Sequence, residues 1–113
     1  HGETSSEKNA FGWYLDGRAA AVFGTHTHIQ TADNRLLTQG TAYISDLGMC
    51  GPYDSVIGLS IDSSIERFLT QRKTQYKVAN CQSAIVQGAH ILLDENIQKA
   101  VSIERIQERV ILG

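Results

Sequence analysis

Two histidines separated by one residue are the clearest chemical signal in the sequence. His26 and His28 lie in the run Gly-Thr-His-Thr-His, directly after the apolar segment 19–23. In an extended backbone, residues i and i+2 project to the same side, so both imidazoles can face one site. Imidazole is a good ligand for transition metals, and the small threonines leave room for an ion beside the backbone. The pattern therefore predicts two metal ligands, and the alternative is a structural or surface pair.

His1 and His90 are the other two histidines. One predicted helix and one predicted strand separate His1 from His26, and together they can return the chain to the same edge of a sheet. His1 could therefore join the same site, or it could be a frayed terminal residue. His90 stands alone in an apolar segment, which favours a packed or edge-exposed side chain over a ligand.

The two cysteines give no sign of a zinc knuckle or a disulfide framework. Cys50 and Cys81 are far apart, with no second cysteine at metal-ligand spacing beside either, so we expect free thiols in a reducing compartment. Cys50 lies in a glycine-rich loop and could act as a nucleophile with a histidine base, but an inert thiol is the simpler interpretation. The sequence lacks a phosphate-binding loop, a dinucleotide fingerprint and a Gly-x-Ser-x-Gly elbow.

The elements that must position the histidines form an α/β pattern. Thr4 and Glu7 have the spacing of a capping box and predict a helix over 5–16. The segment 19–23 is apolar at every position, which predicts a strand buried on both faces. A helix followed by such a strand is the second half of a βαβ unit, so a parallel strand is expected upstream of this sequence.

The rest of the sequence predicts a sheet with an antiparallel end. A second strand is expected over 41–45, followed by a loop over 46–54 whose glycines and proline could form a wall of the site. Ser63 to Glu66 is a capping signal for a short amphipathic helix ending near Leu69. The strand-like segments 76–79, 84–93 and 99–106, with a turn at 94–96, predict an antiparallel meander. No linker or repeat divides the chain, which predicts a single domain.

Composition excludes several classes of protein. The 113 residues are 42% hydrophobic and 19% charged, with a formal charge of −2, which excludes disordered and collagen-like chains and argues against duplex nucleic acid as a partner. The longest apolar run is far too short to span a membrane. The sequence starts with His1 and its one methionine is Met49, so we expect further residues ahead of it in the gene. No leader is visible, which favours a cytoplasmic location.

Several motifs together resemble the C-terminal half of YmdB-like, calcineurin-type metallophosphoesterases. They are His-Gly-Glu-Thr-Ser-Ser-Glu-Lys at 1–8, Gly-Trp-Tyr-Leu-Asp-Gly-Arg at 12–18, Gly-Thr-His-Thr-His-Ile-Gln-Thr-Ala-Asp at 24–33, Gly-Thr-Ala-Tyr-Ile-Ser-Asp at 40–46, Gly-Met-Cys-Gly-Pro-Tyr-Asp-Ser at 48–55 and Lys-Ala-Val-Ser-Ile-Glu-Arg-Ile at 99–106. The resemblance implies a layered α/β fold, a sheet core with flanking helices, of which residues 1–113 are the C-terminal part of a single domain.

The resemblance also implies an activity and a ligand set. It implies phosphodiester hydrolysis, with 2′,3′-cyclic nucleotides as the substrate class, at two iron, manganese or zinc ions. His1 and His26 would bind one ion and His28 the other. The remaining ligands and the proton donor belong to the N-terminal half, which this sequence lacks.

No aspartate of this chain matches the ligands of the missing half. Asp33, Asp46 and Asp54 are therefore expected to be turn and cap residues.

Three functions stay open at this point. The first is a metal-dependent phosphodiesterase that needs its N-terminal half, so that the 113 residues alone bind metal weakly and are inactive. The second is a non-catalytic structural or interaction fragment with incidental histidines. The third is a hydrolase that pairs Ser or Cys with His. A sheet edge left open by the missing half would favour association into a homo-oligomer.

Overall fold

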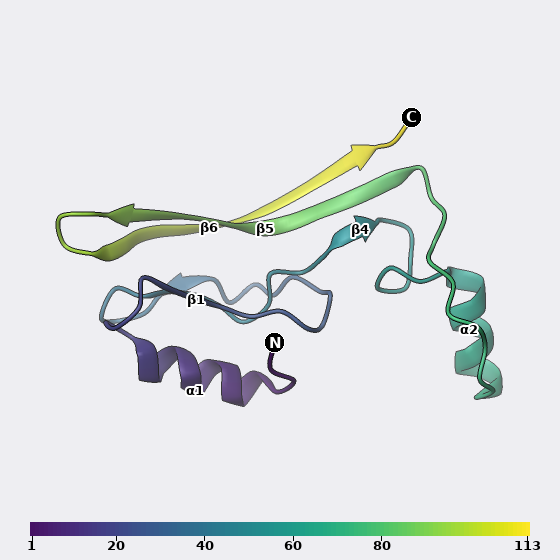
Figure 1. Cartoon of the computed structure of the whole chain (residues 1–113), viewed down its shortest axis with the longest axis horizontal. Helices are drawn as coiled ribbons and strands as arrows, with labels where there is room; N and C mark the ends of the chain where they lie inside the picture. The colour runs from purple at the N-terminus through teal and green to yellow at the C-terminus, as the bar shows by residue number, and fades with distance from the viewer. The chain divides into compact units, whose positions relative to one another are not determined.

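The computed structural model describes all 113 residues, His1–Gly113, and has a mixed α/β fold (Figure 1). The elements are α1 (Ser5–Leu15), β1 (Ala21–Phe23), β2 (Arg35–Leu36), β3 (Ala42–Ile44), β4 (Cys50–Pro52), α2 (Ile61–Thr70), β5 (Ser83–Asp94) and β6 (Lys99–Ile111). The strands form two sheets, in the orders β1-β3-β2 and β4-β5-β6. The predicted fold class is confirmed. Neither helix is long and apolar enough to cross a membrane.

The chain forms two compact units. The first comprises His1–Gly48 and Gln87–Ile106, and the second comprises Met49–Val86 and Gln107–Gly113. Strands β5 and β6 run through both units, so each unit contains part of the hairpin.

Helix α1 of the first unit begins and ends close to where the sequence predicts. Thr4 occupies the N-cap position in an extended conformation, but its side chain makes no capping hydrogen bond. The predicted capping box is therefore wrong, although the helix start is right. At the other end the Asp16 N–H donates to Trp13 O over 3.3 Å, and Gly17 follows with a φ of 83°, a left-handed conformation that glycine adopts at low cost.

Strand β3 is the centre of the first sheet. It pairs in parallel with β1, with Ala21 opposite Ala42 and Phe23 opposite Ile44, and all three of its residues are buried. The expectation that β1 is buried on both faces is wrong for this chain, because Phe23 is 58% exposed. The reason is that β1 lies at the edge of its sheet, with β3 as its one neighbour. Strand β2, which was not predicted, has two residues and pairs antiparallel to β3.

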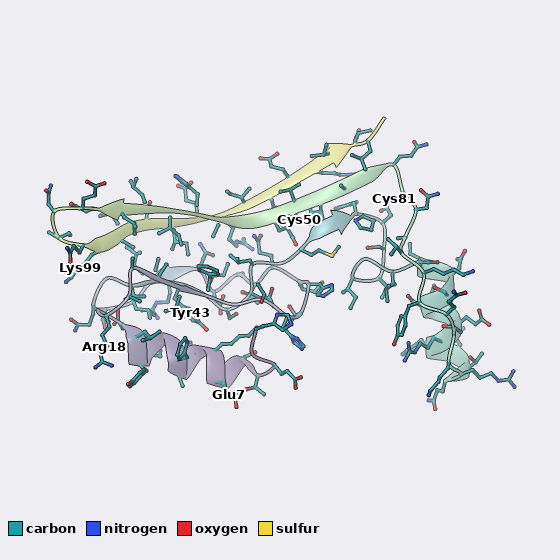
Figure 2. All side chains as sticks on the ribbon, viewed as in Figure 1. Glu7, Arg18, Tyr43, Cys50, Cys81 and Lys99 are labelled. Atoms are coloured by element: carbon teal, nitrogen blue, oxygen red, sulfur yellow. The ribbon has the colours of Figure 1, made fainter.

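The small sheet of the first unit lies between α1 and the part of the hairpin formed by residues 87–106 (Figure 1). Helix α1 approaches the sheet at Gly12, its one buried residue, where an added Cβ would lie 2.7 Å from the ring of Tyr43 (Figure 2). On the hairpin side, the Ala100 N–H donates to Gly40 O over 3.0 Å.

Asp16 anchors the turn between α1 and β1 to the segment before β3. Its carboxylate accepts hydrogen bonds from Gln39 N–H at 2.8 Å, Thr38 Oγ1 at 3.2 Å and Thr41 N–H at 3.3 Å. Burial alone would raise the pKa of Asp16, but the hydrogen bonds, led by that from Gln39, outweigh it and hold the pKa below its ordinary value of 3.8.

In the second unit the segment predicted to be a loop contains a strand. Strand β4 (Cys50–Pro52) pairs antiparallel to β5, with Cys50 opposite Val86 and Pro52 opposite Ala84. Gly51 and Pro52 are poor strand formers, which is why sequence pattern alone pointed to a loop. The strand is three residues long and Pro52 is its last residue.

Helix α2 and the segment after it also differ from the prediction in detail. The helix begins after Ser60 rather than at the predicted Ser63 cap. It ends at Thr70 and is followed by the C-cap residue Gln71, whose φ of 55° is left-handed. The predicted strand over 76–79 is reduced to one isolated bridge between Leu59 and Val78.

The predicted strands of the hairpin are confirmed, and β6 extends past Ile106 to Ile111. The turn forms as expected, because the Asn96 N–H donates to Asp94 Oδ1 over 2.9 Å.

The close approach at Gly12 predicts that Gly12→Ala destabilises the chain by about 1–3 kcal/mol, because the new methyl group would force the Tyr43 ring to move. Urea unfolding followed by circular dichroism measures the change. Gly88→Ala is the matched control, because no atom lies within 4 Å of its added Cβ. Equal stability of the two variants would contradict the packing described for α1.

The lowered pKa of Asp16 makes stability depend on pH in one direction. A carboxyl whose pKa is depressed by folding stabilises the protein above its unfolded pKa, and that contribution is lost as the pH falls through the folded pKa. Asp16→Asn should therefore lower the urea midpoint at pH 7 and reduce its decline towards pH 3. A variant that declines as steeply as the parent chain would show that Asp16 does not contribute.

Candidate metal centre

The histidine loop begins at Gly24, where β1 ends. A Cβ at Gly24 would collide with the carbonyl oxygen of Ser45, so only glycine fits this approach. The Gly24 N–H donates to Ile44 O over 3.1 Å, and Gly24 O accepts from the Leu47 N–H over 2.9 Å. The start of the loop is therefore fixed to the end of β3.

The structure brings His1 and His26 together. His1 Nε2 and His26 Nδ1 lie 3.4 Å apart, and the two rings are nearly perpendicular, with centroids 5.0 Å apart. Helix α1 and strand β1 carry the chain away from His1 and back to it, as the sequence argument required. Two imidazole nitrogens that face each other at this distance can share a proton or bind one metal ion.

The other nitrogen of His1 also has a partner. His1 Nδ1 lies 2.8 Å from Thr25 Oγ1. A histidine that binds metal usually uses its second ring nitrogen in this way, because the hydrogen bond fixes the tautomer and the ring orientation.

Lys8 and Asp46 hold the histidine loop through hydrogen bonds to Thr25 and Thr27. The Lys8 ammonium donates to Thr25 O over 2.7 Å and lies 3.6 Å from Asp46 Oδ2, with side chains that are 11% and 1% exposed. Asp46 Oδ2 also accepts from the N–H and the hydroxyl of Thr27, each over 2.8 Å. Thr27 is thereby held between the two histidines.

The hydrogen bonds to Asp46 keep its carboxyl ionised. Burial alone would raise its pKa, but hydrogen bonds from Gly48 and Thr27 and the charge of Lys8 together lower it below the ordinary 3.8. Both oxygens are occupied by these partners. One oxygen of Asp33 also has two partners, since its Oδ1 accepts from Thr31 Oγ1 and the Ser45 N–H.

Both loop histidines have unusual backbone conformations. The φ of His26 is 125° and that of His28 is 65°, a region that costs a residue with a side chain about 1–3 kcal/mol. The loop is not extended here, so the premise of the argument that both imidazoles can face one site, an extended backbone over His26 and His28, is wrong. Such conformations persist where surrounding contacts enforce them, and Thr27, between the two histidines, makes two hydrogen bonds to Asp46.

The donor set fits part of a metal site. In a tetrahedral zinc site with Zn–N bonds of about 2.0–2.1 Å, two ligand nitrogens lie about 3.3–3.4 Å apart. The separation of His1 Nε2 and His26 Nδ1 is 3.4 Å. No group of three or more His, Cys, Asp or Glu side chains in the chain is placed to hold an ion, so the structure joins His1 with His26 but does not add His28.

A pocket of about 340 Å³ opens beside the histidine pair. It lies between α1 and the strands β1 and β3, and its lining is mainly apolar. The lining residues are His1, Gly2, Glu7, Lys8, Phe11, Val22, Phe23, Gly24, Tyr43 and Ile44.

Sequence reasoning missed the supporting residues Lys8, Thr25 and Thr27. Lysine and threonine are common residue types that mark no particular site. The one available signal was that Lys8 is the one lysine in α1, a helix with few charged residues. His90 is exposed on β5, one of the two outcomes expected for it. Neither Cys50 nor Cys81 forms a disulfide, in keeping with the prediction.

Relatives of the chain are found by sequence and by structure. A family model described as YmdB-like protein matches residues 1–106. A Bacillus subtilis (strain 168) protein named 2′,3′-cyclic-nucleotide 2′-phosphodiesterase is 53% identical over 106 residues, which are 94% of this chain and 40% of that protein.

Two crystal structures superpose closely. A phosphatase from Mycoplasma pneumoniae is 40% identical with a TM-score of 0.89, covering 97% of this chain and 39% of that one. A protein from Thermus thermophilus is 38% identical with a TM-score of 0.87, covering 95% of this chain and 41% of that one. The chain thus spans about 40% of the length of each of these relatives. Because the family model covers nearly the whole chain, the chain belongs to the YmdB-like protein family.

Proposed function

We propose that this chain is part of a metal-dependent phosphodiesterase. The observation that carries the proposal is the pair of imidazole nitrogens at 3.4 Å, one before α1 and one after β1. The names of the Bacillus subtilis and Mycoplasma pneumoniae relatives support phosphoric ester hydrolysis, and the former suggests 2′,3′-cyclic nucleotides as the substrate class.

In this proposal His1 and His26 bind one ion and His28 binds a second. Iron, manganese or zinc are the candidates, and when bound they would stabilise the negative charge that develops on the phosphoryl oxygens. The part of this chain is to present the imidazoles in a fixed geometry. Gly24 and the Lys8–Asp46 pair hold the loop that does so.

The remaining ligands are proposed to come from an upstream segment that pairs with β1. The edge of β1 is open, Phe23 on it is 58% exposed, and the pocket between α1 and β1 is apolar. A parallel strand preceding α1 would complete the βαβ unit. The unmatched length of the relatives is ample for such a segment. Without that segment the same edge would favour self-association.

The proposed location is the cytoplasm. Cys50 and Cys81 form no disulfide, which suits a reducing compartment, where disulfides are rare.

Reconstitution tests the proposed activity. The 113-residue chain alone should bind metal weakly and leave bis-p-nitrophenyl phosphate intact, whereas a mixture with the upstream segment of its gene should hydrolyse it with a metal requirement. His26→Ala in the mixture should lower the rate about 100-fold or more, the scale of losing a preorganised charge-stabilising group. Metal analysis and product absorbance are the measurements.

His90→Ala is the matched control, because His90 is exposed on β5 and should leave the rate unchanged. A mixture that stays metal-free and inactive would support the alternative of a non-catalytic fragment. Activity that survives a chelator would instead favour a Ser or Cys nucleophile.

The open edge of β1 generates a separate prediction. Phe23→Asp should weaken binding of the upstream segment at least about tenfold, because a charge would be buried without a partner. Phe68→Asp on α2 is the control, since Phe68 is 82% exposed and lies in the other unit. Size-exclusion chromatography of the mixtures measures the association. Equal binding by both variants would show that β1 is not the contact.

A further inference from the structure

Thr25 occupies a central place beside the histidine pair. Its hydroxyl lies 2.8 Å from His1 Nδ1, and its carbonyl oxygen accepts from the Lys8 ammonium over 2.7 Å. It therefore touches a residue before α1 and a residue within α1. Because Thr25 directly precedes His26, fixing the Thr25 backbone also fixes the point at which the His26 side chain leaves the backbone.

The neighbouring threonine cannot take the same role. The hydroxyl of Thr27 is committed to Asp46 Oδ2 at 2.8 Å and to Ile29, whose N–H and O lie 3.2 Å and 3.1 Å away. A hydroxyl can accept or donate, and the Thr25 hydroxyl accepts from His1 Nδ1 when this nitrogen carries the proton. The lone pair of His1 Nε2 would then face His26 Nδ1 across 3.4 Å.

Lys8 gives Thr25 a fixed position. It is bound to the buried carboxylate of Asp46, and its side chain is 11% exposed. The Lys8 side chain also packs against Gly2 and Gly24. Its carbons would lie 3.1–3.7 Å from a Cβ added at either glycine. The threonine is thus held from its backbone by Lys8, while its side chain is directed to His1.

We propose that Thr25 is a positioning residue that holds His1 in the tautomer protonated at Nδ1, so that Nε2 is available as a metal ligand. The role of this tautomer in metal binding rests on the proposed function. The tautomer itself can be measured without metal or substrate. Removing an outer partner of a metal-binding histidine typically weakens metal affinity about 10–100-fold, so a comparable loss is expected on removing the Thr25 hydroxyl.

The test compares Thr25→Val with Thr25→Ser in the 113-residue chain. Valine keeps the shape and removes the hydroxyl, whereas serine keeps the hydroxyl. Nitrogen-15 NMR of labelled histidines, at a pH where the imidazoles are neutral, identifies the protonated nitrogen of His1. Titration with Zn²⁺ in the same samples gives the dissociation constant. We expect a mixed tautomer and at least about tenfold weaker Zn²⁺ binding for valine, and the parent behaviour for serine.

Thr38→Val is the matched control, because it removes a hydroxyl that bonds Asp16 and should change neither readout. Persistence of the Nδ1 tautomer and of Zn²⁺ affinity in Thr25→Val would overturn the proposal. If that variant does not fold, the parent chain decides, because a His1 protonated at Nε2 would also overturn it. An inactive reconstituted enzyme with the expected tautomers would count against the proposed function alone.

Discussion

The buried carboxylate of Asp46 is the constraint on which the histidine loop depends. A charge that is 1% exposed must be compensated, and its compensation draws together three parts of the first unit. Lys8 comes from α1, Thr27 from the loop after β1, and the N–H of Gly48 from beyond β3. Satisfying one carboxylate therefore fixes the helix, the loop and the sheet end relative to one another. The approach of His1 to His26 follows from that arrangement.

Sequence pattern predicted the elements whose cause is local. The helix over Ser5–Leu15, the buried strand Ala42–Ile44 and the hairpin follow from periodicity and turn residues. It failed where the cause lies elsewhere in the chain. Strand β4 exists because Cys50 and Pro52 find partners on β5, and the exposure of Phe23 on β1 goes with the place of that strand at the edge of its sheet.

The candidate site was predictable as a set of residue types and not as a geometry. The motif with its two histidines and the place of His1 before a helix pointed to one meeting point, and His1 and His26 do meet. The extended-strand rule failed for His28, because positive φ angles turn the loop. The loop between the two histidines is held to Asp46 through Thr27, a contact that no local pattern around the histidines reveals.

The positive φ angles of His26 and His28 lower stability at the two positions that carry the candidate ligands. Glycine would adopt φ angles of 125° and 65° with less strain than histidine, so substitutions favoured for stability alone at these positions would delete the imidazoles. A screen for heat-resistant variants of this chain would thus select against the two histidines on which the proposed metal site depends. In this loop, a substitution that raises stability would remove an imidazole that the proposed site requires.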